Sequence, residues 1–456
     1  MKSAARHKRC EGAKRGCATV KSTQRRAIGR PYTALIIVVL ALGIPLPLAN
    51  AAIGTGPAED RDFVELAASD LVSLDLPDVA APQIDDPISK AELEDLKTLA
   101  SQEGTSLQDA IDRYAWNDNF ALAVSIVREK HPEALAGAEI VGARGAWVGF
   151  AADAPDAALE IIMAFEKAHP AVAVQVRPGF GFSEIELGRA IATVHYAELA
   201  IPGVRDATTT FDYEIRQITT AVAFSGAAHP GTAEIRRVAI DRLVETGLGK
   251  LLDSISVNAV ETNMPVLSGL HSNTEHLGGE ALSDCTSGFT VQHWNGTTGI
   301  VTAQHCQDNE VDDGVALTYK LGHDGTWGDF QWHTGPQTEP DDFYSGSSTA
   351  LEVNRRDVAA WASPVVGQSI CKNGKAGFKD CDTVRKKHVC SLIWCELIMT
   401  EHQYGVPGDS GGPWFWNYTA YGVHHGWDYD PVWPFDRSLF SDVTFLFNAL
   451  DIQVRK

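Results

Sequence analysis

A serine flanked by glycines offers the clearest candidate chemistry in this sequence. Residues 408–413 read Gly-Asp-Ser-Gly-Gly-Pro. Small neighbours let a carbonyl group approach the hydroxyl of Ser410, and the backbone N–H groups of Gly408 and Ser410 can converge on the oxyanion that the attack creates. Glycine-rich serine loops also occur in phosphate-binding and structural turns, so this motif alone leaves those alternatives open.

A histidine and an aspartate upstream could activate this serine. The apolar run 300–306 ends in His305 and a cysteine, a pattern typical of a strand, and Asp329 begins an alternating aromatic and polar stretch. We predict that His305 is the general base and that Asp329 orients its imidazole, because apolar neighbours would shield that bond. The competing carboxylates lie among polar and glycine neighbours typical of solvated loops: Asp308, Asp312, Asp313, Asp324, Asp341 and Asp342.

Chain order separates two classes of serine hydrolase. Residues 408–412 also satisfy the Gly-x-Ser-x-Gly elbow of α/β-hydrolases, whose order is serine, acid, histidine. No Asp or Glu lies between Ser410 and the histidines that follow it, so the sequence cannot supply that order. The order His305, Asp329, Ser410 is the one that chymotrypsin-like double β-barrels use.

These motifs carry a family resemblance. Residues 302–306, Thr-Ala-Gln-His-Cys, together with 408–413 resemble the chymotrypsin-like serine proteases, and 371–374 through Cys381 resemble their streptogrisin and alpha-lytic protease branch. The resemblance covers about residue 277 to the C-terminus. It implies an all-β catalytic domain of two six-stranded β-barrels, protein or peptide substrates, and no cofactor. Gln304 departs from the small residue usual before the histidine.

The cysteines agree with an exported protein. Six of the eight lie between residues 285 and 395, and the other two fall near the N-terminus. Exported thiols usually oxidise, and the spacings lack two close Cys-x-x-Cys pairs, so we expect disulfides and no metal site. With the resemblance, the expected pairs are Cys285–Cys306, Cys371–Cys381 and Cys390–Cys395.

The resemblance also implies roles for Lys372 and for residues 424–426. In the bacterial branch an internal cation pairs with the aspartate before the nucleophile, and Lys372 matches that position for Asp409; the alternative is an exposed turn lysine.

The pocket for the substrate residue before the cleaved bond is expected to be lined by His424, His425 and Gly426. Relatives with a glutamyl preference place a histidine where His424 stands, and an imidazole can bind a substrate carboxylate. The alternatives are a structural histidine and a broad or large-apolar preference.

The N-terminal 51 residues are typical of a signal peptide. Residues 1–30 are basic, 35–44 are apolar, and 49–51, Ala-Asn-Ala, offer a cleavage site. Pro45 and Pro47 follow an apolar run shorter than the roughly 20 residues that a membrane span requires, so we expect no stable membrane anchor. The sequence therefore predicts a secreted, extracellular protein of bacterial type.

Residues 52–276 have no cysteine and are expected to form a pro-region. Its first part, 52–103, is expected to be an acidic, flexible lead-in. Residues 104–276 are expected to form an α+β domain. The resemblance implies that this domain assists folding of the protease and inhibits it until it is removed by cleavage between residues 261 and 277. The alternative is a binding domain that stays attached. The expected helices are 155–169, 185–199 and 232–245, a further helical stretch begins near Gly104 with a cap at 106–109, and the expected strands are 146–150, 172–177 and 218–224.

The net charge of −21 argues against nucleic acid as a partner. Together these observations predict a secreted serine endopeptidase made as an inactive precursor, with residues 277–456 as its protease domain. A secreted esterase that uses the same site, or a non-catalytic binding protein on a protease scaffold, are the alternatives.

Overall fold

The computed structural model describes residues 88–224, 230–262, 277–312, 314–336, 339–346, 354–429 and 436–456. The expected signal peptide, most of the expected lead-in and most of the expected cleavage segment lie outside these residues. Residues 88–262 are called the N-terminal region below, and 277–456 the C-terminal region. No helix of the described residues is long and apolar enough to cross a membrane.

The first half of the C-terminal region, completed by a strand from the end of the chain, forms a five-stranded sheet of order β11-β12-β8-β7-β22. Its strands are β7 (Thr290–His293), β8 (Thr298–Thr302), β11 (Thr318–Gly325), β12 (Gly328–Thr334) and β22 (Ile452–Val454). Two short hairpins flank it: β9 (Val311–Asp312) with β10 (Val315–Ala316), and β13 (Asp342–Tyr344) with β14 (Arg355–Asp357). Within the described residues this sheet has five strands, one fewer than the expected barrel.

The second half of the C-terminal region is a closed ring of six strands. The order is β16-β19-β20-β21-β18-β17, and β16 also pairs with β17. Closure leaves no unpaired edge among these strands, which suits a small β domain. The strands are β16 (Ser369–Lys372), β17 (Asp380–Ser391), β18 (Trp394–Thr400), β19 (Pro413–Trp416), β20 (Thr419–Tyr429) and β21 (Asp436–Asp442), with β15 (Ala360–Trp361) beside β20. The chain then returns to β22 through η4 (Val443–Phe445) and α7 (Leu446–Leu450).

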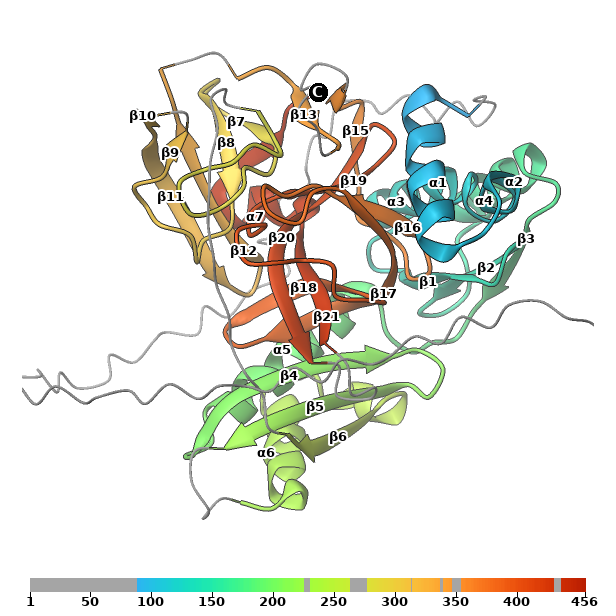
Figure 1. The fold of residues 1–456 in the computed structure, drawn as a ribbon. Coiled ribbons are helices and arrows are strands. Elements are labelled where there is room, and N and C mark those ends of the chain that lie inside the picture. The colour runs from blue at the N-terminus through green and yellow to red at the C-terminus, as the bar shows by residue number, and fades with distance from the viewer. Residues whose placement is uncertain are drawn as a thin grey trace, which may run out of the picture. The chain divides into compact units, whose positions relative to one another are not determined.

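The N-terminal region mixes helices and strands (Figure 1). Capping boxes at Ser106 and Ser183 start α2 (Leu107–Tyr114) and α5 (Glu184–Leu199). In each box the serine side chain accepts the backbone N–H of the residue three positions later, and the carboxylate of that residue accepts the backbone N–H of the serine. The elements are α1 (Lys90–Glu103), α2 (Leu107–Tyr114), α3 (Asn117–Lys130), β1 (Leu135–Val141), β2 (Gly145–Phe150), α4 (Asp156–Ala168), β3 (Ala173–Arg177), α5 (Glu184–Leu199), β4 (Val204–Asp212), β5 (Gln217–Phe224), α6 (Thr232–Glu245), η2 (Gly249–Asp253) and β6 (Ser256–Glu261).

Regular structure begins earlier than the sequence analysis expected. Residues 90–103, assigned there to a flexible lead-in, form α1. Ser89 caps its first turn by accepting the N–H of Glu92, and Gly104 ends it in the left-handed conformation with φ of 66°. Leu96 and Leu99 are buried, so packing of this face stabilises a helix that acidic composition alone does not reveal.

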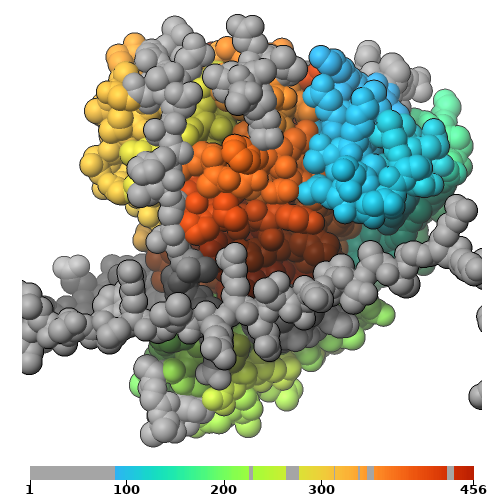
Figure 2. Space-filling model, viewed as in Figure 1, coloured from blue at the N-terminus to red at the C-terminus, as the bar shows by residue number. Residues whose placement is uncertain are grey.

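The two regions share a sheet and a core. Strand β4 pairs antiparallel with β17, so β4, β5 and β6 extend the sheet beyond the ring. A single apolar cluster contains Trp116 and Phe120 of the N-terminal region together with Phe343 and Phe415 of the C-terminal region. In Figure 2 the blue atoms of α1 lie beside orange atoms of the C-terminal region. Gln102 of α1 accepts the backbone N–H of Cys381 at 3.0 Å.

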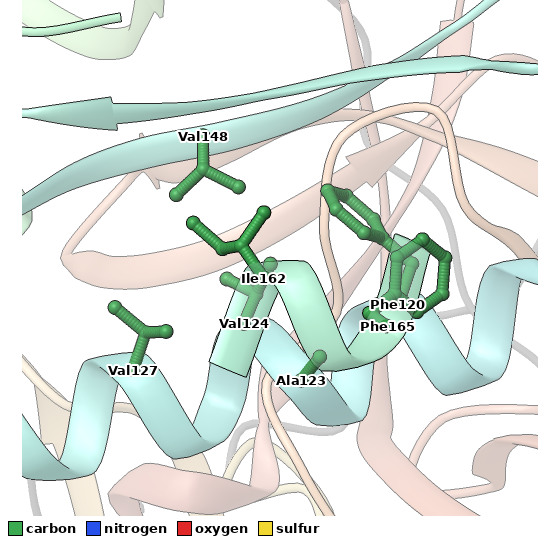
Figure 3. Close-up of a pocket in the computed structure, with 7 residues that line it drawn as sticks. All are labelled: Phe120, Ala123, Val124, Val127, Val148, Ile162 and Phe165. Atoms are coloured by element: carbon green, nitrogen blue, oxygen red, sulfur yellow. The ribbon is translucent and has the colours of Figure 1, made fainter. Parts of the chain in front are cut away.

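An apolar cavity within the N-terminal region lies between α3, α4 and β2 (Figure 3). No polar side chain lines it, so nothing there could orient a ligand by hydrogen bonding, and we interpret it as a packing gap. Its lining residues are Phe120, Ala123, Val124, Val127, Val148, Ile162 and Phe165.

A buried carboxylate on α1 forms ion pairs with residues of the C-terminal region. Asp95, which is fully buried, accepts two hydrogen bonds from Arg356, at 2.8 and 2.9 Å. Lys379 Nζ lies 2.5 Å from the same carboxylate, and Asn417 N donates to it at 2.8 Å. Each charged group therefore depends on the other region for its partner.

A second buried cluster surrounds Glu184, at the start of α5. Its carboxylate lies 2.7 Å from Arg128 Nε, 2.7 Å from Lys387 Nζ and 3.3 Å from His388 Nε2. Burial would raise the pKa of Glu184, but the neighbouring cations hold it well below its ordinary value. Burial disfavours protonation of His388, but Glu396 and Glu184 raise its pKa to about 9, so this imidazole is positively charged at neutral pH.

We predict that Glu184→Gln strongly destabilises the protein. Two buried cations, Lys387 and His388, and the partly exposed Arg128 would lose their shared carboxylate, and breaking a buried ion pair typically costs about 3–5 kcal/mol. Urea unfolding followed by fluorescence measures the change in midpoint. Glu245→Gln is the control, because Glu245 is 65% exposed in a surface pair with Arg242, where little stability is at stake. Equal midpoints for the two variants would contradict the prediction.

Candidate active site

The loop that carries Ser410 is held from two sides. Ser410 is half-buried in the turn between β18 and β19. On one side, Thr286 N donates to Ser410 O at 2.7 Å and Thr286 Oγ1 donates to Gly408 O at 2.7 Å. On the other side, Gly411 N donates to His424 O at 2.7 Å. The backbone around the serine is therefore fixed by both halves of the C-terminal region.

Two backbone amides of this loop are without hydrogen-bond acceptors in the described part of the chain. Gly408 has φ of 101°, a conformation that favours glycine. In the part of the chain that the structure describes, the N–H groups of Gly408 and Ser410 donate no hydrogen bond. Both donors are thus available to a developing negative charge.

The aspartate before the serine forms a buried ion pair with Lys372. Lys372 Nζ lies 2.7 Å from Asp409 Oδ2, and both side chains are fully buried. Asp409 Oδ1 also accepts the N–H groups of Ala376 and Gly377, at 3.0 and 2.8 Å. Burial would raise the pKa of Asp409, but the charge of Lys372 lowers it below its ordinary value. Lys372 is therefore an internal cation and not an exposed turn lysine.

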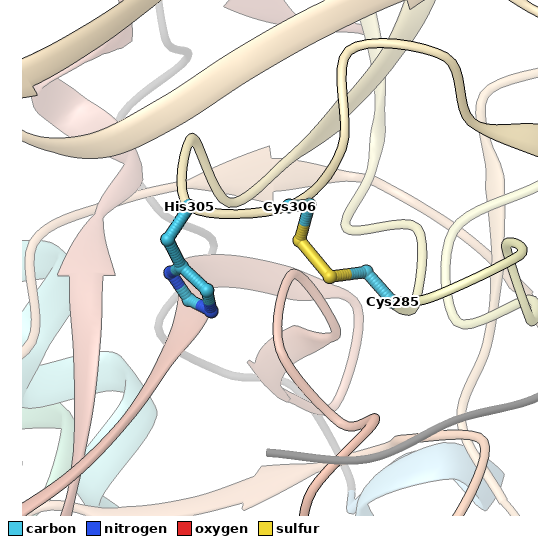
Figure 4. Close-up of side chains that lie close together, drawn as sticks. All are labelled: Cys285, His305 and Cys306. Atoms are coloured by element: carbon cyan, nitrogen blue, oxygen red, sulfur yellow. A yellow bond between two sulfur atoms is a disulfide. The ribbon is translucent and has the colours of Figure 1, made fainter. Parts of the chain in front are cut away.

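His305 is fixed by Asp329. The imidazole Nδ1 donates to Asp329 Oδ2 at 2.6 Å, and the backbone N–H of His305 donates to Oδ1 at 3.1 Å. Asp329 is fully buried near the start of β12, where its own N–H is bound by Ser441 Oγ at 3.0 Å. Cys306, which directly follows His305 in the chain, forms a disulfide with Cys285 (Figure 4).

The electrostatics suit a general base and a carboxylate that stays ionised. Burial acts to lower the pKa of His305, but the charge and hydrogen bond of Asp329 raise it above its ordinary value. Burial acts to raise the pKa of Asp329, but the two histidines that contact it lower it strongly. No hydrogen bond joins His305 to Ser410 within the described residues. In unliganded sites that bond is often long and tightens when substrate binds.

His424 is a buried, neutral imidazole. Its side chain is 2% exposed, and Trp414 Nε1 donates to its Nδ1 at 3.2 Å. Burial and the charge of Lys372 lower the pKa of His424 to about 3. Because Nδ1 accepts a bond, the proton of the neutral ring is on Nε2. That atom faces Gly405, where a Cβ would lie only 2.2 Å from it, so a glycine is required there.

His425 lies against Asp329, a contact that the sequence analysis missed. The sequence analysis assigned His425, with His424 and Gly426, to the substrate pocket. In the structure His425 Nδ1 donates to Asp329 Oδ2 at 2.6 Å, and the ring centroids of His425 and Trp394 are 4.7 Å apart. Gly426 has φ of 157° and open space where a Cβ would stand, which would permit a peptide backbone to approach.

The six cysteines of the C-terminal region form the three expected pairs. Cys285 is bonded to Cys306, Cys371 to Cys381 and Cys390 to Cys395. Cys371 and Cys381 face each other across β16 and β17, and the third pair closes the hairpin of β17 and β18. The sulfurs are therefore not available as thiolates.

Several solved structures that resemble this chain, at low similarity, are bacterial serine proteases. A Nocardiopsis protease is 18% identical, with a TM-score of 0.34 over 41% of this chain and 100% of its own. A glutamic-acid-specific serine protease, described as using a histidine triad in substrate binding, is 22% identical, with a TM-score of 0.33 over 39% of this chain and 100% of its own. Thermobifida fusca protease A is 22% identical, with a TM-score of 0.32 over 39% of this chain and 97% of its own.

No family model and no curated protein matches the sequence. At TM-scores this low, likeness to a solved structure establishes no activity for this chain. The chemistry of the site must be inferred from its own geometry.

We predict that Lys372→Met destabilises the protein by about 3–5 kcal/mol at neutral pH, because Asp409 would remain as a buried, unpaired charge. Since the pKa of Asp409 is lowered in the folded protein, this stabilisation is lost as the pH falls through that lowered pKa. The gap in urea midpoint between wild type and variant should therefore shrink below about pH 4.

Lys320→Met, at an exposed lysine of β11, is the control and should leave the midpoint unchanged. A gap for Lys372→Met that does not depend on pH would show that Asp409 is not the group responsible.

Proposed function

We propose that this chain is the precursor of a secreted serine endopeptidase whose nucleophile is Ser410. The observation that carries the proposal is the buried Asp329 carboxylate, which holds His305 through two hydrogen bonds, at 2.6 and 3.1 Å. The loop of Ser410 adds two amides without partners among the described residues. Base, orienting acid, nucleophile and oxyanion donors are the four components of acyl transfer by a serine.

The proposed reaction proceeds through an acyl-enzyme. His305 Nε2 takes the proton of Ser410 as its oxygen attacks the peptide carbonyl, and the amides of Gly408 and Ser410 bind the oxyanion. Asp329 stabilises the imidazolium, which then protonates the leaving amine as the C–N bond breaks. Water, deprotonated by His305, hydrolyses the ester, and Ser410 recovers its proton.

The N-terminal region is proposed to act as a pro-region that assists folding and inhibits the protease until it is removed. The shared sheet between β4 and β17 and the buried ion pairs of Asp95 and Glu184 support this role, because they bind the region tightly to the protease half. Removal is placed between residues 261 and 277. The three disulfides agree with an extracellular location.

Preference for an acidic residue before the cleaved bond is the finer part of the proposal. His424 would supply it as a neutral hydrogen-bond donor, because its Nδ1 accepts a bond from Trp414 and the proton of the ring is therefore on Nε2. Such a donor can bind a carboxylate without first being protonated.

The decisive experiment is mass spectrometry of a diverse peptide library after incubation with the processed protein. We predict cuts that vanish in Ser410→Ala and persist in Ser283→Ala, since Ser283 is a half-buried serine bound to Glu310 and outside the site. If the wild-type protein cuts after glutamate and His424→Phe loses this preference, the acidic pocket is supported. If the wild-type protein cuts after large apolar residues, the acidic pocket is contradicted. No cleavage by processed, disulfide-bonded protein contradicts the endopeptidase assignment.

Maturation offers a separate prediction. The exported wild-type precursor should convert to a fragment of about 20 kDa, the size of a single domain, while Ser410→Ala stays at full length. Immunoblotting of culture medium with an antibody against the C-terminus follows the conversion. Normal processing of Ser410→Ala would show that another protease matures the chain and would contradict self-maturation.

A further inference from the structure

One oxygen of Asp329 serves two imidazoles. Oδ2 accepts the Nδ1–H of His305 at 2.6 Å and the Nδ1–H of His425 at 2.6 Å. Oδ1 accepts only the backbone N–H of His305 among the bonds that the described residues make to it. We propose that His425 is a positioning residue for His305 and acts through the carboxylate oxygen that both imidazoles share.

The surroundings hold His425 in the orientation that this bond requires. Its side chain is 8% exposed, and Trp394 packs on it with ring centroids 4.7 Å apart. The rings of His305 and His425 are perpendicular, with centroids 5.5 Å apart. His425 therefore meets the carboxylate from a direction different from that of His305, and neither ring can replace the other at the shared oxygen without moving.

Sharing the oxygen changes what Asp329 can do for His305. Each N–H donor that binds a carboxylate oxygen stabilises its negative charge and makes it a weaker acceptor for other donors. Removing the His425 donor leaves Asp329 a stronger partner for protonated His305. His305 would then keep its proton to higher pH, and less of it would be available as a base near neutral pH.

The charged groups around His425 are few within the described residues. Asp329 from β12 and His305 from the loop after β8 contact it, and His424 adjoins it on its own strand. Trp394 from β18 and Ser441 from β21, which binds the N–H of Asp329, carry no charge.

The functional consequence rests on the proposed peptidase, but the test can be made without activity. The full chain with Ser410→Ala, labelled at histidine ¹³Cε1, is titrated by NMR, and the His305 signal is assigned by its loss in His305→Gln. We predict that His425→Phe, which keeps a ring and removes the donor, raises the pKa of His305 by about 0.5–1 unit, the size expected for losing one hydrogen bond to a charged group.

His425→Asn is the matched variant, because its Nδ2–H₂ can replace the lost donor while it cannot become charged. It should return the His305 titration at least halfway to that of the Ser410→Ala parent. In the active enzyme, the acid limb of kcat/KM against pH should move upward in His425→Phe by the same amount, with KM unchanged. An unchanged His305 titration in folded His425→Phe overturns the proposal, as does an equal shift in both variants, which would indicate a packing role only.

If the library experiment finds no cleavage but the titration shifts as predicted, the proposed peptidase fails while the coupling between the two histidines stands. If cleavage is found and the titration does not shift, only the role of His425 is lost.

Discussion

The site depends on compensating one buried charge. Asp329 is wholly shielded from water, and an isolated carboxylate there would cost several kcal/mol. Its hydrogen-bond donors come from distant parts of the chain, His305 after β8 and His425 on β20, while Ser441 of β21 binds its backbone N–H. Because β12 belongs to the five-stranded sheet and β20 and β21 to the closed ring, the hydrogen bonds to Asp329 fix the position of the sheet relative to the ring. The position of His305 follows from that arrangement.

The same principle recurs at three other buried carboxylates. Asp409 takes its partner Lys372 from β16, and this ion pair anchors the loop of Ser410. Asp95 pairs with Arg356, and Glu184 with Lys387 in addition to Arg128 of its own region, so both carboxylates bind cations of the C-terminal region. If the N-terminal region is removed as proposed, Arg356 and Lys387 lose these partners and must be hydrated in the mature protein. Release of that region therefore carries an electrostatic cost that proteolysis, being irreversible, can overcome.

Much of this arrangement could be predicted from the sequence because the signals are local. The loop of Ser410, the apolar run that delivers His305 and the spacing of the cysteines are short motifs, and the helix expected over 155–169 matches α4 within one residue at each end. The contacts that tertiary packing creates could not be predicted. Helix α1 depends on burial of Leu96 and Leu99, and the closure of β16 on β17 depends on the ring as a whole. His425 gave no signal of its own, since adjacency to His424 suggested a pocket wall and not a bond to Asp329.

The most direct test of the central claim is covalent labelling of the processed protein with a fluorophosphonate, followed by peptide mass spectrometry. If Ser410 is a nucleophile activated by His305, a phosphonyl adduct should form on Ser410 alone. The adduct should be lost in His305→Ala and should form much more slowly in Asp329→Asn. The control Asp308→Asn, at an exposed aspartate, should be labelled at the wild-type rate. Absence of the adduct in folded, disulfide-bonded protein, or labelling that survives His305→Ala at the wild-type rate, would contradict the account.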